Sequence, residues 1–496
     1  MPAGAETILN VGIAQPDLGS LDPHRTAQTP DMAIIGWMYN GLVRFKPGSV
    51  DPRTIEPDLA ESWEASADKL TWTFRLRKGV MFNNGFGEFT AEDAVFSLKR
   101  AADPKTSAFS SDYADFESIT ALDPSTVQIK LRKPIPSVLG KLTPYLAGNI
   151  VSKKAVEALG DGFRGKGGGT GPFAVAEYKP NVSLTLVANK SYFRGAPKID
   201  KIVYKYILSD ATRDLAYTSG EIDLLYGRHD VKWVERMKED KHTVVDVFRP
   251  AELAQIYLNT TKKPLNDLRV RQAIAHGLNA SEFIKFKGPG ITLPPVSVIP
   301  GGYLGTDEQA PLLPFDPEKS KKLLAEAGYP NGINLKVIQT SLPSSLFTMQ
   351  VVQAQLKRVG VNLQVDVVDH PTYHAQIRKD LSDIVQYAAG RFPVADTYLT
   401  QFFHSRSTVG TPTAVTNFSH CAVADAEIDA ARVETDGAKQ VELWKTAQRK
   451  LIENVCSVPL YEQMQLWARR DKLDYGFKFE GSMTLGPLIT EMATLK

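Results

Sequence analysis

Residues 56 to 100 constrain the fold of this chain more than any other stretch, because strand, turn and helix signals follow one another there without a gap. Between residues 70 and 77, apolar and polar side chains alternate. An alternation with a period of two predicts a strand that buries one face. The apolar positions of this strand are Leu70, Trp72, Phe74 and Leu76.

A turn and a capped helix are expected directly after this strand. Residues 83–85 read Asn-Asn-Gly, which are residue types that tolerate the positive φ of a tight turn. Thr90 has the position of a helix N-cap, and Asp93 stands three residues later, near the position of a capping-box acid. The helix that follows can direct three apolar side chains to a core: Val95, Phe96 and Leu98.

Helices and strands also alternate in the second half of the chain. Asp316 is followed by proline and glutamate, so a well-capped helix is expected to begin there and to end at Gly328. Residues 344–358 form a second amphipathic helix pattern, and residues 361–367 alternate as a strand. Repeated helix-then-strand order predicts an α/β fold.

The composition narrows the possible classes of protein. A length of 496 residues is too great for one hydrophobic core, so we expect two or three domains. The formal net charge of +2 gives no reason to expect a nucleic acid or an anionic membrane as partner. No apolar run approaches the roughly 18 residues that span a bilayer.

The motifs of the chain resemble one family along nearly its whole length. The run from residue 56 to residue 100 is similar to the pattern AESWE…LTWTFRLRKGV…FTAEDAVFSLKR of the family-5 extracytoplasmic solute-binding proteins, the peptide and nickel-type receptors of ABC importers. Further segments are similar to motifs of this family and occur in the same order: LDP, YNGLV, GTGPFAVAEY, NKSYFRGAPKIDKIVYKYI and SGEIDLL.

The resemblance implies an α/β, two-lobed periplasmic-binding-protein fold (type II-like, of the large peptide-receptor class) with a ligand cleft between the lobes. We expect residues 1–259 and 473–496 to form lobe I, with an extra subdomain at roughly 45–175. Residues 260–472 should form lobe II. The chain would then cross between lobes near Asn259–Thr261 and near Lys472.

The resemblance also implies a place and partners for the protein. We expect an exported chain whose signal peptide has been removed, periplasmic or lipid-anchored outside the cytoplasm. Its partners would be a small-molecule ligand and an ABC permease with its ATPase in the membrane. We expect a monomer without a cofactor.

Cys421 and Cys456 are the only two cysteines, and they could form one bridge or remain thiols. Related receptors sometimes bridge cysteines near the position of Cys421. The corresponding partner position here, near Ser405, is not a cysteine, so we expected Cys421 to be free.

Three motifs with catalytic or metal-binding associations favour a structural interpretation. Residues 160–166 match most of a phosphate-binding loop, but Gly167 replaces the Ser or Thr that would hold Mg²⁺, so we predict a surface loop. His370 and His374 have the spacing of a zinc pair, but Pro371 should keep the two rings off a shared helical face.

The adjacent pair His420-Cys421 lacks a third orienting group and a nucleophile elbow. We therefore predict no metal and no catalytic residue. A hydrolase acting on peptides or glycosides remains the alternative class, with no sequence support beyond this pair.

Arg391 is the residue that bears most on ligand choice. Family members that hold free dipeptides carry an Asp for the ligand's amine in a W-x-G-D run, followed by D-P-D. The corresponding run here, aligned on Asp396, has Arg391 in place of that Asp. The reversed charge makes an anionic ligand, such as a sugar phosphate or an opine-like conjugate, as plausible as a peptide. A surface or structural ion pair is the other interpretation of Arg391.

We predict further ligand contacts around Arg391 and in the first lobe. Phe392 would supply a stacking face and Ser341 a hydroxyl. Four residues on expected loops or strand ends of the first lobe complete the predicted set: Thr29, Tyr226, Arg228 and Gln255. The sequence thus predicts a receptor that captures a small polar solute by hinge closure and makes or breaks no bond.

Overall fold

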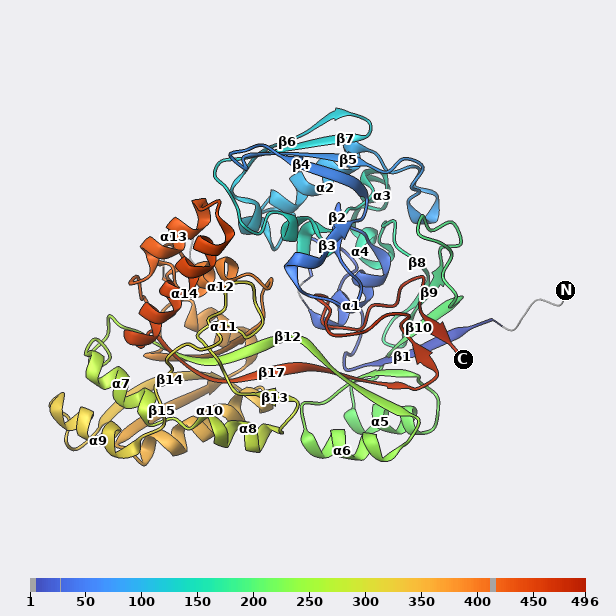
Figure 1. Ribbon diagram of the computed structural model, residues 1–496. Helices are drawn as coiled ribbons and strands as arrows, with labels where there is room; N and C mark the ends of the chain where they lie inside the picture. Colours follow the sequence, from blue (N-terminus) through green and yellow to red (C-terminus); the bar gives the residue numbers. More distant parts are fainter. Residues whose placement is uncertain (1–5, 27, 411–415) are drawn as a thin grey trace. The chain divides into compact units, whose positions relative to one another are not determined.

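The computed structural model describes residues 6–26, 28–410 and 416–496, and the chain divides into two compact units (Figure 1). Unit 1 comprises residues 1–250 and 465–496, and unit 2 comprises residues 251–464. These divisions lie earlier in the chain than the expected crossings. The reason is that β12 (Thr243–Leu258) and β17 (Ser457–Arg470) are long strands that continue past each division instead of ending there.

The main sheet of unit 1 mixes parallel and antiparallel pairing. β1 (Ile8–Ile13) pairs in parallel with both β10 (Lys201–Tyr206) and β11 (Leu224–Tyr226). β9 (Ser183–Ala188) and β8 (Phe173–Lys179) extend the sheet in antiparallel order beyond β10. The helices of this part of the unit include α1 (Thr29–Met38), α3 (Lys153–Leu159), α4 (Phe163–Lys166), α5 (Asp210–Thr218) and α6 (Val231–Glu239).

A second, antiparallel sheet in unit 1 has a hydrophobic core of its own. Phe74 and Leu76 are buried on one face of the sheet, as the alternation predicts. Helix α2 (Ala91–Ala102) packs against it and begins with the predicted capping box, in which the Thr90 N–H donates to Asp93 Oδ2 over 3.1 Å. The strands run in the order β4 (Ala60–Ala65), β5 (Thr71–Leu76), β7 (Thr126–Leu131) and β6 (Phe116–Asp123).

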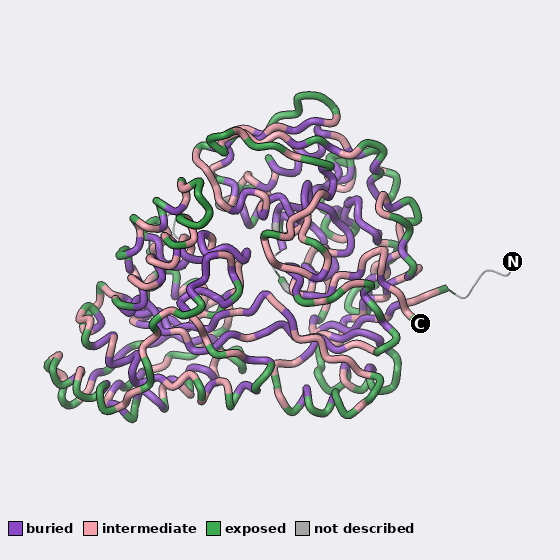
Figure 2. Tube along the Cα trace, viewed as in Figure 1, coloured by how far each residue is buried: buried purple, intermediate pink, exposed green. Residues whose placement is uncertain are grey.

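The sheet of unit 2 is parallel at one edge. β14 (Ile333–Thr340) pairs in parallel with β15 (Val361–Val368) and with β16 (Ile384–Ala389), and β12 pairs antiparallel to β16. β14 and β16 are mostly buried, β15 is exposed at alternate positions, and Figure 2 shows the outer turns of the helices exposed. The helices of the unit are α7 (Leu268–His276), α8 (Ala280–Lys287), α9 (Pro317–Glu326), α10 (Pro343–Lys357), α11 (His370–Ile377), α12 (Ala395–Phe403), α13 (Asp425–Val433) and α14 (Gly437–Glu453).

Short strands complete the fold. β2 (Val43–Phe45) pairs with β3 (Ile55–Pro57), and β18 (Leu473–Asp474) pairs with β19 (Thr494–Leu495), all within unit 1. In unit 2, β13 (Thr292–Leu293) pairs with the first half of β17.

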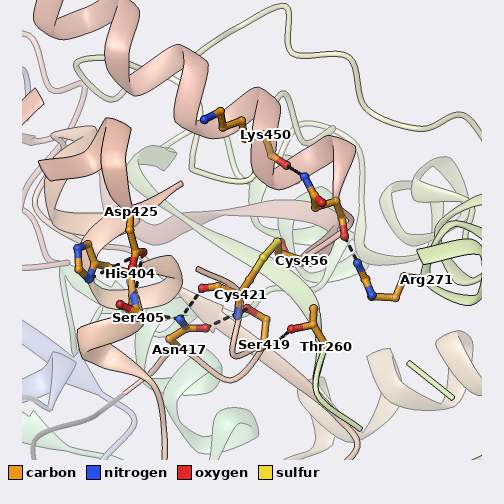
Figure 3. The surroundings of a disulfide bond; sticks show 12 residues. Thr260, Arg271, His404, Ser405, Asn417, Ser419, Cys421, Asp425, Lys450 and Cys456 are labelled. Atoms are coloured by element: carbon orange, nitrogen blue, oxygen red, sulfur yellow. Dashed lines mark hydrogen bonds and ion pairs between the residues drawn. A yellow bond between two sulfur atoms is a disulfide. The ribbon is translucent and has the colours of Figure 1, made fainter. Parts of the chain in front are cut away.

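The two cysteines form a disulfide, so the prediction of a free Cys421 is wrong (Figure 3). Their Cα atoms lie 5.8 Å apart although 35 residues separate them in sequence. Cys456 immediately precedes β17, and the loop that carries Cys421 is fixed beside it, where the Asn417 side-chain amide donates to the Cys421 carbonyl over 3.0 Å. The partner is therefore set by tertiary packing around β17, which the local sequence around Cys421 does not encode.

The glycine-rich run after residue 160 is mostly exposed up to residue 166, as predicted, but it is not a loop. Residues 160–162 form a 3-10 turn, α4 follows, and Gly167, Gly168 and Gly169 are buried. A Cβ added to Gly169 would stand 2.2 Å from the Met38 carbonyl oxygen at the end of α1. These glycines allow one backbone to pack directly on another, which explains the run without any phosphate.

Candidate ligand-binding site

Arg391 lies in the short connection between β16 and α12 of unit 2, and the structure fixes its backbone tightly. The Tyr303 hydroxyl accepts from the Arg391 N–H and donates to the Arg391 carbonyl oxygen, both over 2.7 Å. Tyr303 itself is buried. One phenol therefore positions the residue at which the chain turns from strand to helix.

Gln401, Gly390 and Phe402 help to orient the guanidinium of Arg391. Its Nε donates to Gln401 Oε1 over 2.6 Å, and its Nη1 donates to the Gly390 carbonyl over 2.8 Å. Its Cζ lies 5.1 Å from the centre of the Phe402 ring, an arrangement in which cation and aromatic face attract. Gln401 and Phe402 both come from α12, so this helix holds the cation in place.

The carboxyl of Glu252 shows that this part of unit 2 is poorly solvated. Burial raises the pKa of Glu252, and the positive charge of Arg391 opposes that rise. A medium that disfavours one isolated charge strengthens the attraction of a fixed cation for an incoming anion.

Two predicted residues of unit 2 differ in their accessibility. Phe392 is buried, with 7% of its surface exposed, and the ring over the guanidinium is that of Phe402. Ser341 is exposed just after β14, and its N–H donates to the Val368 carbonyl over 2.8 Å. The Ser341 hydroxyl stays a predicted contact.

Gln255 is not available to a ligand, which corrects its place in the predicted set. It belongs to unit 2 and is fully buried in β12. Its side-chain oxygen accepts from Ser457 Oγ, and its amide nitrogen donates to three acceptors: Tyr257 Oη, Tyr398 Oη and the Val298 carbonyl. These hydrogen bonds of the buried Gln255 side chain connect β12 with β17 and α12.

In unit 1, Arg228 is held by carboxylates. Its Nη2 donates to Asp214 Oδ2 over 2.9 Å, and its Nη1 lies 3.6 Å from Asp210 Oδ2. Tyr226 ends β11 with its ring edge-on to Trp467, 5.5 Å between centres. Thr29 begins α1, and its side chain lies outside the described structure.

The two histidines of α11 face each other, so the prediction that they would not share a face is wrong. Proline is tolerated in the first turn of a helix, and α11 therefore begins at His370 itself. The Nε2 atoms of His370 and His374 lie 3.1 Å apart. Within the described residues, no group of three or more His, Cys, Asp or Glu side chains is arranged to hold a metal ion.

His420 and Cys421 do not form a catalytic pair. His420 Nε2 lies 3.2 Å from Asp380 Oδ1, and the Cys421 sulfur is bonded to that of Cys456.

Among the described helices, none is long and apolar enough to cross a membrane.

Tyr303, Gln401 and Phe402 were not predicted as neighbours of Arg391. Gln401 and Phe402 stand ten and eleven residues after it, which corresponds to a turn followed by about two helical turns. A helix start predicted near Asp396 would have brought both close to Arg391. Tyr303 comes from a distant loop and carries no local signal.

Two α/β units joined by two chain crossings define a periplasmic-binding-protein fold, and solved structures of that class match nearly the whole chain. The structure of MoaA from A. tumefaciens R10, in complex with mannopinic acid, has a TM-score of 0.88 and 49% sequence identity, and the match covers 99% of this chain and 100% of that one. The structure of DppA from Helicobacter pylori, in complex with the peptide STSA, has a TM-score of 0.83 and 26% identity, and the match covers 98% of each chain.

Comparison of sequences defines the family. The family model of bacterial extracellular solute-binding proteins, family 5 (Middle), matches residues 54–409. Di/tripeptide-binding protein 2 of Pseudomonas aeruginosa (strain UCBPP-PA14) is 30% identical over 464 residues, which are 87% of this chain and 85% of the relative. The chain belongs to the family-5 solute-binding proteins, and it is an extracytoplasmic, substrate-binding component of an ABC importer.

Proposed function

We propose that the solute carried by this protein is an anionic conjugate of a sugar and an amino acid, of the opine kind, and that Arg391 binds its carboxylate. The arrangement of Arg391 is the observation that carries the proposal. A planar guanidinium offers paired donors to a carboxylate and keeps its charge at any physiological pH. Its bonds to Gln401 and to the Gly390 carbonyl orient it in advance.

The similarity to MoaA supports the same ligand class. At 49% identity over nearly the whole of both chains, it is well above the 26% identity with the peptide-bound DppA. An acid such as mannopinic acid has the carboxylate that Arg391 is suited to bind. A free peptide amine at the same place would meet a like charge, and a poorly solvated site screens that repulsion weakly.

Capture is proposed to proceed by a hinge movement, with bending where β12 and β17 pass from one unit to the other. The solute must bind the closed form more tightly than the open form, because otherwise binding would not drive closure.

We further propose that the protein acts as a monomer, that its signal peptide has been removed, and that it releases its solute chemically unchanged. The alternative of a hydrolase is disfavoured because the relatives of this chain are solute-binding transport proteins.

Calorimetric titration with mannopinic acid and with a panel of dipeptides tests the ligand class. Wild type should bind the opine and bind dipeptides weakly, and Arg391→Ala should reduce opine affinity by about 2–5 kcal/mol, as for other buried charges truncated on one side. Arg236→Ala is the matched control, because it removes an arginine that is 54% exposed in unit 1. Tight dipeptide binding that is insensitive to Arg391→Ala would refute the proposal.

A further inference from the structure

His370 and His374 form a defined pair on α11 that the proposed ligand site does not use. The two rings lie 4.4 Å apart between centres, at 74° to each other, and their Nε2 atoms are separated by 3.1 Å. Both side chains are partly accessible. Two imidazole nitrogens therefore converge on one point beside α11.

The separation of these nitrogens corresponds to two adjacent ligands of one metal ion. With metal–nitrogen bonds of about 2.05 Å, two ligands lie about 2.9 Å apart at a right angle and about 3.3 Å apart at a tetrahedral angle. The observed 3.1 Å falls between these values. A metal could thus bind without a change in the backbone of the helix.

Thr340 orients one of the two rings. Its Oγ1 lies 3.1 Å from His370 Nδ1. When Nδ1 donates to this hydroxyl, the free electron pair of His370 is on Nε2, which is the atom that faces His374. A hydrogen bond on the far nitrogen is the usual way in which proteins fix the orientation of a histidine that binds a metal.

We propose that His370 and His374 bind a late first-row divalent cation, Cu²⁺ most tightly and Ni²⁺ or Zn²⁺ less so. Imidazole suits these ions, and their affinities follow that general order. No third His, Cys, Asp or Glu joins the pair within the described residues, so water fills the remaining positions and the ion exchanges readily. This proposal does not depend on the identity of the transported solute.

The test is titration of the full-length, solute-free protein with CuCl₂ in the presence of glycine as a competing chelator. Wild type should bind one Cu²⁺ whose electron paramagnetic resonance spectrum shows coupling to imidazole nitrogen. His370→Ala and His374→Ala should each lower the affinity at least tenfold, with thermal melts to verify that each variant is folded. Thr340→Val should weaken binding about tenfold, and Thr340→Ser should restore it, because the hydroxyl orients the His370 ring through Nδ1.

His242→Ala is the control, because this histidine is in unit 1 with its side chain 76% exposed, and its loss should leave Cu²⁺ binding unchanged. The proposal is overturned if wild type and the double variant His370→Ala/His374→Ala titrate alike. It is also overturned if His242→Ala weakens binding as much as His374→Ala does.

Discussion

Arg228 of unit 1 and Arg391 of unit 2 were both predicted to contact the solute, and their surroundings differ sharply. Arg228 is bonded to Asp214, a carboxylate that also binds Arg236 and the indole of Trp233. The guanidinium of Arg391 donates to a side-chain amide and a carbonyl and lies over an aromatic ring, and its charge also acts on the carboxyl of Glu252.

The difference shows how the same residue type can serve structure or recognition. An arginine held by aspartates has its charge compensated, so an incoming anion gains little from it. The amide, the carbonyl and the aromatic ring around Arg391 orient its guanidinium in advance. We therefore assign Arg228 a structural role and keep Arg391 as the proposed ligand residue.

The largest effect expected in a test of this comparison is the loss of stability when the carboxylate that holds Arg228 is removed. Asp214→Ala removes the carboxylate shared by Arg228, Arg236 and Trp233, and should lower the free energy of unfolding by about 2–4 kcal/mol, because charged donors lose their acceptor. Urea denaturation measures the change. Asp366→Ala, at a carboxylate that is 62% exposed, should change it by less than about 0.5 kcal/mol.

The second prediction concerns a variant that gives Arg391 a carboxylate partner, as Arg228 has. Gln401→Glu places a carboxylate at the acceptor of Arg391 Nε and should weaken binding of an anionic solute by about 1–3 kcal/mol. Stability should not fall, because an ion pair replaces a hydrogen bond. Calorimetry and thermal melts measure both quantities. Unchanged affinity would show that Arg391 does not meet the anion.

A smaller effect is expected from the residue that fixes the Arg391 backbone. Tyr303→Phe removes a hydroxyl that bonds both the N–H and the carbonyl of Arg391, and should reduce solute affinity by about 1 kcal/mol. Association and dissociation rates can be followed by stopped-flow fluorescence. Tyr329→Phe, at a half-buried tyrosine that follows α9, should leave both rates unchanged.

The smallest effect concerns Glu252. Burial raises its pKa in the folded state above the unfolded value, so the folded state binds more protons between the two values and stability falls as pH rises through that window. Glu252→Gln should therefore raise the melting temperature at pH 7 and have no such effect at pH 4. An equal gain at both values would mean that the ionised carboxylate is not the cause.

Local features of the fold were predictable from the sequence. The capping box of α2 formed as expected, and so did the helix after Asp316, where Asp316 Oδ1 accepts from the Lys319 N–H. The alternating run at 361–367 became β15. These features depend on neighbours within a few residues.

Features that depend on distant contacts were not predictable. The disulfide partner of Cys421 stands beside it only because β17 returns through unit 2. The burial of Gln255 follows from acceptors on α12 and on a loop more than forty residues away. The spacing of His370 and His374 correctly indicates a shared helical face, because the proline after His370 lies in the first turn of α11, where it is tolerated.

The disulfide between Cys421 and Cys456 turns helices α13 and α14 into a covalently closed ring of the chain. A protease cut inside this ring leaves the two fragments bonded to each other. The last part of the chain, which includes β17 and its pairing with β11, would stay attached after such a cut. A nicked receptor outside the cytoplasm would thus keep its C-terminal strand until a reductant opened the ring.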